Sequence, residues 1–255
     1  MLASLRGIIR IILLALVIIP CATMQCLFIW LPRPYFYFFP ALLSKGVLWA
    51  LDVKLDIRGR PSTETPTLFL ANHSSYLDIT ILQALLPVSF VSKSEVARWP
   101  LFGQLAYLEG CIFIDRANRG DTKNQSEVIS RRLKSGGNLV LFPEGTTGDG
   151  ARILPVKSSL LGVAMEAKAV QPITIAFTAL DGIPPGRTFR YYYAWIGDES
   201  LPPHMWRVLT SGDMTVTVTY HDPIYDGLDN RKALAKRVED ALRSGLNGAL
   251  TSRAA

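Results

Sequence analysis

The pattern of apolar and polar positions divides the chain into an apolar N-terminal stretch and a longer segment of mixed periodicity. Residues 11–31 form a run of 21 positions without a charged side chain, preceded by Arg6 and Arg10 and interrupted by Pro20. A helix of about 20 apolar residues can cross the hydrocarbon core of a bilayer. A second run, residues 34–51, is rich in aromatic side chains, which favour the membrane interface.

We therefore predict that residues 1–50 form an N-terminal membrane-anchoring helical segment, which either spans the bilayer or lies in its interface as a helical hairpin. A cleaved signal peptide is the first alternative, but residues 21–23, Cys-Ala-Thr, make a poor cleavage site. A buried core helix is the second, although the uncharged run is long for one.

Residues 51–255 are predicted to form one further domain in which strands and helices alternate. Period-two alternation and short apolar runs predict strands at residues 53–58, 67–71, 88–91, 111–114, 138–142, 173–178 and 214–220. Helical spacing predicts helices at residues 76–86, 122–134, 160–169 and 230–246, and Trp99-Pro100 is placed in a loop. The expected fold is α/β, a layered domain with a mixed sheet, preceded by the apolar anchor.

Composition excludes several classes of protein. Apolar residues make up 49% of the chain and charged residues 19%, a balance that suits a packed core rather than disorder. The net charge of +6 suits an anionic partner, such as a lipid bilayer, a phosphorylated substrate or nucleic acid. Without an arginine-rich tract or an RNA-binding motif we expect no nucleic-acid partner. Three cysteines without CxxC spacing favour free thiols, and we expect no metal and no cofactor.

The strongest candidate for chemistry is residues 72–78, Asn-His-Ser-Ser-Tyr-Leu-Asp. His73 comes directly after a predicted buried strand, where α/β folds place their active sites. Asp78 falls in the first turn of the next helix and can reach back to the histidine. An aspartate bonded to one ring nitrogen fixes the tautomer and leaves the other nitrogen as a base. On spacing alone, a histidine that only caps the helix is equally compatible.

The HxxxxD spacing occurs twice. The second copy, His221 to Asp226, contains Pro223 and follows a strand with the alternation of a sheet edge, so we interpret it as a surface connection. His204, between Pro203 and Met205, is expected in a loop.

A second candidate is residues 142–146, Phe-Pro-Glu-Gly-Thr. The buried strand before it should deliver Glu144 and Gly145 to the sheet edge that carries His73. Gly145 permits close backbone approach, Glu144 can bind a hydroxyl, and nearby backbone N–H groups can bind an oxyanion. The alternative is a strand-ending turn with a solvated glutamate.

Together these residues resemble the glycerolipid acyltransferase family, which includes the bacterial 1-acylglycerol-3-phosphate acyltransferases. The family motif NHxSxxD matches residues 72–78, and its FPEGT motif matches residues 142–146. A glycine, an apolar strand and an arginine match residues 110–116, and a proline-led apolar strand resembles residues 170–173. The four motifs occur in the family's order between residues 51 and 220.

The resemblance implies roles for the matched residues. His73 would be the general base and Asp78 its orienting partner. Arg116 would hold the phosphate or another anionic group of the acceptor. Glu144 and Gly145 would position the acceptor, and Thr146 and Lys157 would complete the substrate site.

The implied reaction moves an acyl chain from acyl-CoA or acyl-carrier protein to the free hydroxyl of a lysolipid, without an acyl-enzyme. The first acceptor implied is 1-acyl-sn-glycerol-3-phosphate, which would give phosphatidic acid. The family also implies a place at the bacterial inner membrane, with the catalytic domain in the cytoplasm.

One departure from the family adds an alternative acceptor. Many members follow FPEGT with a basic residue and a serine, whereas this chain continues Thr147-Gly148-Asp149-Gly150. Either Arg152 or Lys157 would have to replace that cation. A lyso-ornithine lipid is therefore an alternative acceptor, and the following LPVKSSL segment resembles the branch that acylates such aminolipids.

Two readings outside acyl transfer remain as alternatives. A membrane-bound esterase would need an activated serine, yet Ser74 and Ser75 lack a GxSxG elbow and are interpreted as helix caps. A lipid-binding protein would not need His73 and Asp78.

Overall fold

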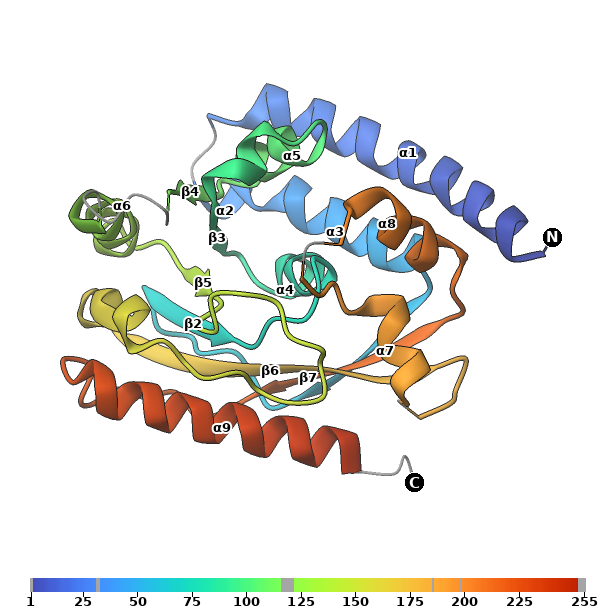
Figure 1. Ribbon diagram of the computed structural model, residues 1–255. Helices are drawn as coiled ribbons and strands as arrows, with labels where there is room; N and C mark the ends of the chain where they lie inside the picture. The colour runs from blue at the N-terminus through green and yellow to red at the C-terminus, as the bar shows by residue number, and fades with distance from the viewer. Residues whose placement is uncertain (1, 31–32, 116–121, 185, 198, 252–255) are drawn as a thin grey trace.

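The structure, a computed structural model, describes residues 2–30, 33–115, 122–184, 186–197 and 199–251. In these residues seven strands form one sheet with helices on both faces (Figure 1). The strands are β1 (Val53–Arg58), β2 (Thr67–Ala71), β3 (Ser89–Lys93), β4 (Ile112–Ile114), β5 (Leu139–Leu141), β6 (Ala169–Leu180) and β7 (Met214–Tyr220). The α-helices are α1 (Leu2–Phe28), α2 (Arg33–Phe36), α3 (Phe38–Ala50), α4 (Leu77–Leu85), α5 (Phe102–Leu108), α6 (Thr122–Lys134), α7 (Arg187–Tyr193), α8 (Leu201–Thr210) and α9 (Arg231–Thr251). Two 3₁₀ segments, η1 (Ser94–Arg98) and η3 (Ser158–Glu166), complete the described elements.

The sheet is mixed, as predicted. Its order is β1-β7-β6-β2-β5-β3-β4, with β6 and β7 antiparallel and the other neighbours parallel. Strands β6, β2, β5, β3 and β4 therefore point one way, and β1 and β7 point the other way. The carboxyl ends of β2 and β5 meet at one edge of the sheet, where parallel α/β sheets place their sites.

The burial of each strand explains whether its sequence is continuously apolar or alternates between apolar and polar residues. All five residues of β2 and all three of β5 are buried, because helices cover both faces of the sheet centre. β1 alternates because it lies at the edge. β7 also alternates, yet it lies between β1 and β6, so the prediction of an edge-like strand there was wrong.

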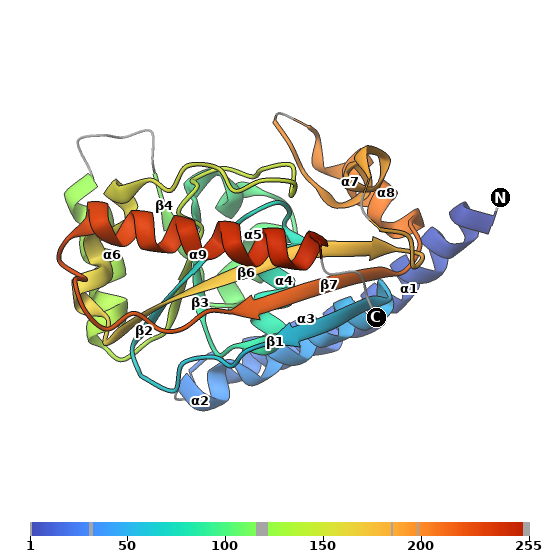
Figure 2. The same ribbon diagram turned by 90° about the horizontal axis from the view of Figure 1, so that it is seen from below.

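The two faces of the sheet carry different helices. α9 lies across one face, and α3 and α4 cover the other, with α1 and α8 outside them (Figures 1 and 2). α9 packs against the sheet with a stripe at four-residue spacing, Leu234, Val238, Leu242 and Leu246. Its basic residues consequently lie on the side of the sheet opposite to α1.

Several short elements differ from the sequence prediction. The segment expected as a helix at residues 160–169 is the 3₁₀ segment η3, and β6 starts four residues earlier than predicted. The loop expected around Trp99 leads into α5, and α7 and α8 were not predicted. Helices of 7 to 10 residues have little stability of their own, and packing against the rest of the chain decides whether they form.

α1 is long and apolar enough to cross a membrane. It lies along α3 and α8, and its outer side exposes large apolar residues such as Ile12, Leu16 and Ile19. The predicted boundary at residue 50 falls at the end of α3, which packs against α4 of the following segment. The division into residues 1–50 and 51–255 stays a prediction.

Arg10 fixes α1 to the sheet-containing part of the chain. Its side chain is buried and donates through Nη2 to the Leu51 carbonyl at 2.8 Å. Nη1 donates to the carbonyl of Ser211 at 2.9 Å and reaches those of Leu209 and Val208 at 3.2 and 3.4 Å. These carbonyls lie at the ends of α3 and α8, where a cation is favoured. The Val208 carbonyl also accepts from the N–H and the hydroxyl of Ser211.

Arg10→Met should lower the free energy of unfolding by about 2–3 kcal/mol, because it removes the donor of the Leu51 and Leu209 carbonyls. The matched control is Arg6→Met, since Arg6 is exposed and makes one bond, to the Ser211 carbonyl at 2.7 Å. Thermal unfolding of the detergent-solubilised protein measures both changes. Equal midpoints for the two variants would contradict the role given to Arg10.

Candidate active site

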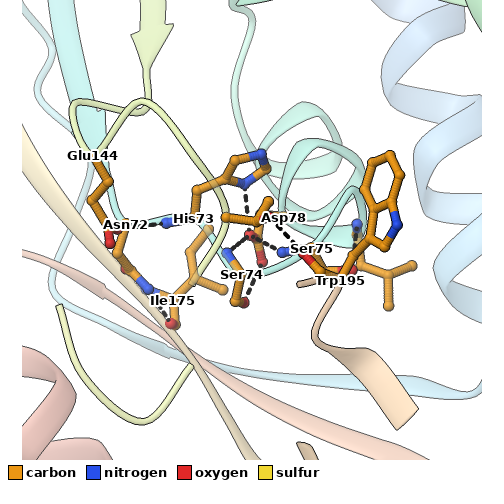
Figure 3. A network of polar contacts seen from close by, with 10 residues as sticks. Asn72, His73, Ser74, Ser75, Asp78, Glu144, Ile175 and Trp195 are labelled. Carbon is orange, nitrogen blue, oxygen red and sulfur yellow. Dashed lines mark hydrogen bonds and ion pairs between the residues drawn. The ribbon is translucent and has the colours of Figure 1, made fainter. Parts of the chain in front are cut away.

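The carboxylate of Asp78 organises the turn between β2 and α4. Its Oδ2 accepts from His73 Nδ1 at 2.9 Å and from the backbone N–H groups of Ser74 and Ser75 at 2.6 and 2.8 Å (Figure 3). The side chain is fully buried. Asp78 thus closes the turn and orients the histidine at the same time, as the sequence predicted for this pair.

His73 is held with one nitrogen turned inward. Since the Asp78 carboxylate accepts at Nδ1, that nitrogen carries the proton and Nε2 keeps a lone pair. The ring stacks on Phe142 with centroids 3.9 Å apart and planes 15° apart. Its side chain is 17% exposed, so Nε2 can act as a base toward a ligand.

Glu144 connects the two motifs through backbone bonds. Its Oε1 accepts from the N–H of His73 at 2.9 Å, and its Oε2 accepts from the N–H of Leu154 at 2.8 Å. Burial raises the pKa of this carboxyl to about 7, although the two N–H bonds act in the opposite direction. With both oxygens occupied in this way, Glu144 positions the turn between β2 and α4, residues 72–76, which we call the catalytic turn. Its predicted contact with the acceptor stays a prediction.

Further backbone and side-chain bonds fix the same turn from distant segments. The Gly148 N–H donates to the His73 carbonyl at 2.8 Å, and the Trp195 N–H donates to the Ser74 carbonyl at 2.9 Å. The Trp195 carbonyl in turn accepts from the hydroxyl of Thr147. Sequence reasoning missed Trp195, because no local pattern marks a contact across more than a hundred residues.

Asn72 locks the end of β2 to β6. Its side-chain amide donates to the Ile175 carbonyl at 2.9 Å and accepts from the Ile175 N–H at 2.8 Å. The motif contained this residue, but its role becomes visible only in the sheet. The strand end before His73 is thereby held in place, as the predicted role of His73 as a base would require.

Three further predicted substrate residues, Gly145, Thr146 and Lys157, lie beside this turn. Gly145 has a positive φ of 72°, and a Cβ there would lie 2.8 Å from Lys157 Nζ, so the glycine makes room for the lysine. Lys157 and Thr146 are exposed. Arg116 lies outside the described residues.

Neither serine of the turn is placed as a nucleophile. Ser74 and Ser75 are buried, Ser74 Oγ lies 3.4 Å from Asp78 Oδ1, and Ser75 Oγ accepts from the Leu77 N–H at 3.3 Å. The N-cap of α4 is Tyr76, without a side-chain cap, so the prediction that these serines cap the helix was wrong. Neither hydroxyl is bonded to a histidine that could activate it, which does not favour the esterase alternative.

The two other histidines are structural. His221 Nε2 bonds to Thr174 Oγ1 at 2.8 Å, while Asp226 is exposed and pairs with Arg237, so the second HxxxxD copy forms no His–Asp pair. His204 is not a loop residue as predicted. It is buried in α8, where Nδ1 lies 3.2 Å from the Tyr76 hydroxyl and burial lowers its pKa.

The described part of the chain holds no group of three or more His, Cys, Asp or Glu side chains arranged for a metal ion.

Comparison with known proteins gives a consistent result. A family model described as "Acyltransferase" matches residues 54–177, which include both motifs. The lyso-ornithine lipid O-acyltransferase of Brucella abortus (strain 2308) is 38% identical and covers 90% of this chain and 89% of its own length. The 1-acyl-sn-glycerol-3-phosphate acyltransferase of Neisseria meningitidis serogroup B is 34% identical over 79% of this chain and 78% of its own length.

A solved structure shares the fold. The 1-acyl-sn-glycerophosphate acyltransferase PlsC from Thermotoga maritima superposes with a TM-score of 0.73 and covers 99% of this chain and 97% of its own. At 20% sequence identity this likeness shows the fold alone.

Glu144→Gln should change how stability depends on pH. Folding raises the pKa of Glu144 from 4.5 to about 7, so the folded state favours the protonated acid. This contribution is present below about pH 4.5 and is lost as the pH rises through 7. Relative to the variant, the wild type should lose about 2–3 kcal/mol of unfolding free energy over that range.

Urea unfolding of the detergent-solubilised protein at several pH values measures this difference. Glu127→Gln, at an exposed position of α6, is the matched control and should leave the pH dependence unchanged. The prediction would be contradicted if the difference in unfolding free energy between the wild type and Glu144→Gln did not change between pH 4.5 and 7.

Proposed function

Because the chain belongs to the acyltransferase family and is an O-acyltransferase like its relatives, we propose that it acylates the free hydroxyl of a lysolipid, with lyso-ornithine lipid as the first acceptor. The observation that carries the reaction type is the His73–Asp78 pair, in which Nδ1 is engaged and Nε2 is left as the base. The acyl donor is a thioester, acyl-CoA or acyl-carrier protein.

The proposed step needs no covalent enzyme intermediate. Nε2 of His73 removes the proton of the acceptor hydroxyl as its oxygen attacks the thioester carbonyl. A C–O bond forms, the C–S bond breaks, and the proton passes from the imidazolium to the leaving thiolate. Asp78 stabilises the imidazolium, and its two further N–H bonds keep it in place during the step.

The charges beside the catalytic turn support a zwitterionic acceptor. Asp149 follows Gly148, which bonds to the His73 carbonyl, and Asp149 Oδ2 lies 3.8 Å from Arg190 Nη1 of α7. This ion pair is long and partly exposed, with side-chain exposures of 39% for Asp149 and 27% for Arg190. Ornithine carries both a carboxylate and an ammonium group, so Arg190 and Asp149 can each bind the opposite charge.

A second acceptor, 1-acyl-sn-glycerol-3-phosphate, is favoured by a different observation. The ammonium of Lys157 lies over Gly145, and Lys157 and Arg152 are both exposed next to the FPEGT turn. They could supply the phosphate with the cation that is missing after Thr146. The relative from Neisseria meningitidis, named for this acceptor, supports it as well.

We place the reaction at a membrane, in keeping with a lipid acceptor and with the exposed apolar side of α1. The further proposal is the bacterial inner membrane, with the catalytic domain on the cytoplasmic side, where thioester donors are made.

Asp78→Asn should lower kcat by about 10³-fold or more, because the amide favours the wrong imidazole tautomer. The readout is thiol release from acyl-CoA by the detergent-solubilised protein. His73→Ala should lower kcat at least as much and leave only a small residual rate, and the double variant should keep that residual rate, since Asp78 acts through His73. A double variant with a clear additional loss would show that Asp78 has an independent role.

The acceptor assignment predicts that Asp149→Asn changes KM for one acceptor and not for the other. Asp149→Asn should raise KM for lyso-ornithine lipid about tenfold, since it removes the partner of the ammonium group. The same substitution should not raise KM for lysophosphatidic acid. Arg190→Gln should raise KM for the aminolipid similarly. Asp226→Asn, in an exposed ion pair with Arg237, is the matched control.

Thiol release with lysophosphatidic acid alone would favour the second acceptor and contradict the zwitterion argument. Release with neither acceptor, from acyl-CoA and from acyl-carrier protein, would contradict acyl transfer to these lysolipids.

A further inference from the structure

A cavity lies at the sheet edge opposite to the catalytic turn. It measures about 400 Å³ and is lined by the end of α1, the α2–α3 junction, α5, the turn before β4 and one side chain of α6. The lining residues are Ile29, Phe36, Tyr37, Tyr107, Gly110, Cys111 and Arg132. Because β2, β5, β3 and β4 are parallel, the turn before β4 and the catalytic turn after β2 belong to opposite edges.

Arg132 gives this cavity its chemistry. Its Nη1 donates to the buried Ser89 Oγ at 2.7 Å, and the same hydroxyl lies 2.9 Å from the Tyr37 hydroxyl. Within the described residues no carboxylate forms an ion pair with Arg132. The guanidinium is therefore held in one position, uncompensated, with further N–H donors available for an anion.

Among the described residues that line the cavity, none is acidic. Glu109 precedes Gly110, but it lines a separate cavity against α1, and burial raises its pKa to about 7. The positive charge of Arg132 is thus the dominant charge among the cavity's lining residues.

The position of the cavity selects a lipid as the source of that anion. Ile29 lies at the end of the apolar helix α1, next to Trp30, which is 93% exposed, and Tyr107 in the lining is 66% exposed. Exposed Trp and Tyr side chains at the end of an apolar helix favour the level of the lipid headgroups. A phosphate at that level would meet Arg132, while acyl chains would continue along Ile29 and the exposed side of α1.

We propose that this cavity binds the phosphate of an anionic membrane phospholipid through Arg132 and the Tyr37 hydroxyl, at a site separate from the acceptor and donor sites. Bound there, the lipid joins α1, α3 and α6 at one point. The folded enzyme would then bind a phospholipid of the membrane directly, whether or not the lysolipid acceptor is bound.

The test is lipid binding by the full-length protein in a neutral detergent. Short-chain phosphatidylglycerol, the matching diacylglycerol and inorganic phosphate are titrated separately, and the midpoint of thermal unfolding is measured. Phosphatidylglycerol should raise the midpoint in a saturable way, whereas diacylglycerol and inorganic phosphate should not at equal concentration. Saturation by inorganic phosphate with no competition from phosphatidylglycerol would overturn the lipid assignment.

Variants on one helix sharpen the test. Arg132→Gln should weaken phosphatidylglycerol binding at least about tenfold, since a charge-assisted pair to the phosphate is lost. Arg131→Gln, exposed on the same turn of α6, is the matched control and should bind like the wild type. Arg132→Lys keeps the charge and serves if the glutamine variant does not fold; it should bind with intermediate affinity. Wild-type affinity in both Arg132 variants would overturn the proposal.

His73→Ala separates this site from the catalytic one. It should bind phosphatidylglycerol like the wild type, although it lacks acyltransferase activity. If binding were lost with His73→Ala and retained with Arg132→Gln, the lipid would occupy the acceptor site and the proposal would be wrong.

Discussion

The buried carboxylate of Asp78 is the interaction on which the catalytic turn depends. One oxygen accepts from an imidazole and from two consecutive backbone N–H groups, in surroundings without solvent. A buried carboxylate is costly unless hydrogen bonds compensate its charge, so burial requires the three donors. The same burial strengthens each of these hydrogen bonds, because the surroundings have a low dielectric constant. The conformation of residues 73–75 follows from this requirement, and with it the direction of the His73 ring.

The bonds around that turn come from segments that are far apart in the chain. Glu144 ties it to the segment after β5, Asn72 ties β2 to β6, and Trp195 ties it to the connection between α7 and α8. Parallel strands make this possible, because their carboxyl ends bring separate loops to one edge of the sheet. Phe142 completes the arrangement by covering one face of the imidazole. His73 is thus positioned by the fold as a whole, which suits its proposed role in transferring an acyl group to a hydroxyl.

The apolar N-terminal segment is integrated with the rest of the fold rather than attached to it by a linker. Arg10 satisfies carbonyls at the ends of α3 and α8, and the exposed side of α1 remains apolar. The basic residues of α9 lie on the opposite side of the sheet, so they and the apolar side of α1 do not form one surface. The cavity around Arg132 lies at the end of α1, where a bound phosphate would add a polar contact to the apolar one.

The sequence by itself determined the elements whose pattern is local and long. The central strands β2 and β5 are continuous apolar runs in the sequence, because helices cover both faces of the sheet there. The sequences of α6 and α9 are amphipathic, because one face of each helix is buried. The spacing of His73 and Asp78 within one turn, and the placement of Glu144 after a parallel strand, were likewise predictable, since short-range geometry and strand direction decide them.

Tertiary structure alone decided the remaining features. α5, α7 and α8 are too short to be stable without partners, and the burial of His204 depends on Tyr76, which lies 128 residues away in the chain. The use of both Glu144 oxygens by backbone N–H groups, the role of Trp195 and the burial of Arg10 also rest on contacts between distant segments. Such contacts leave no periodic trace in the sequence, because packing, rather than local conformational preference, brings their partners together.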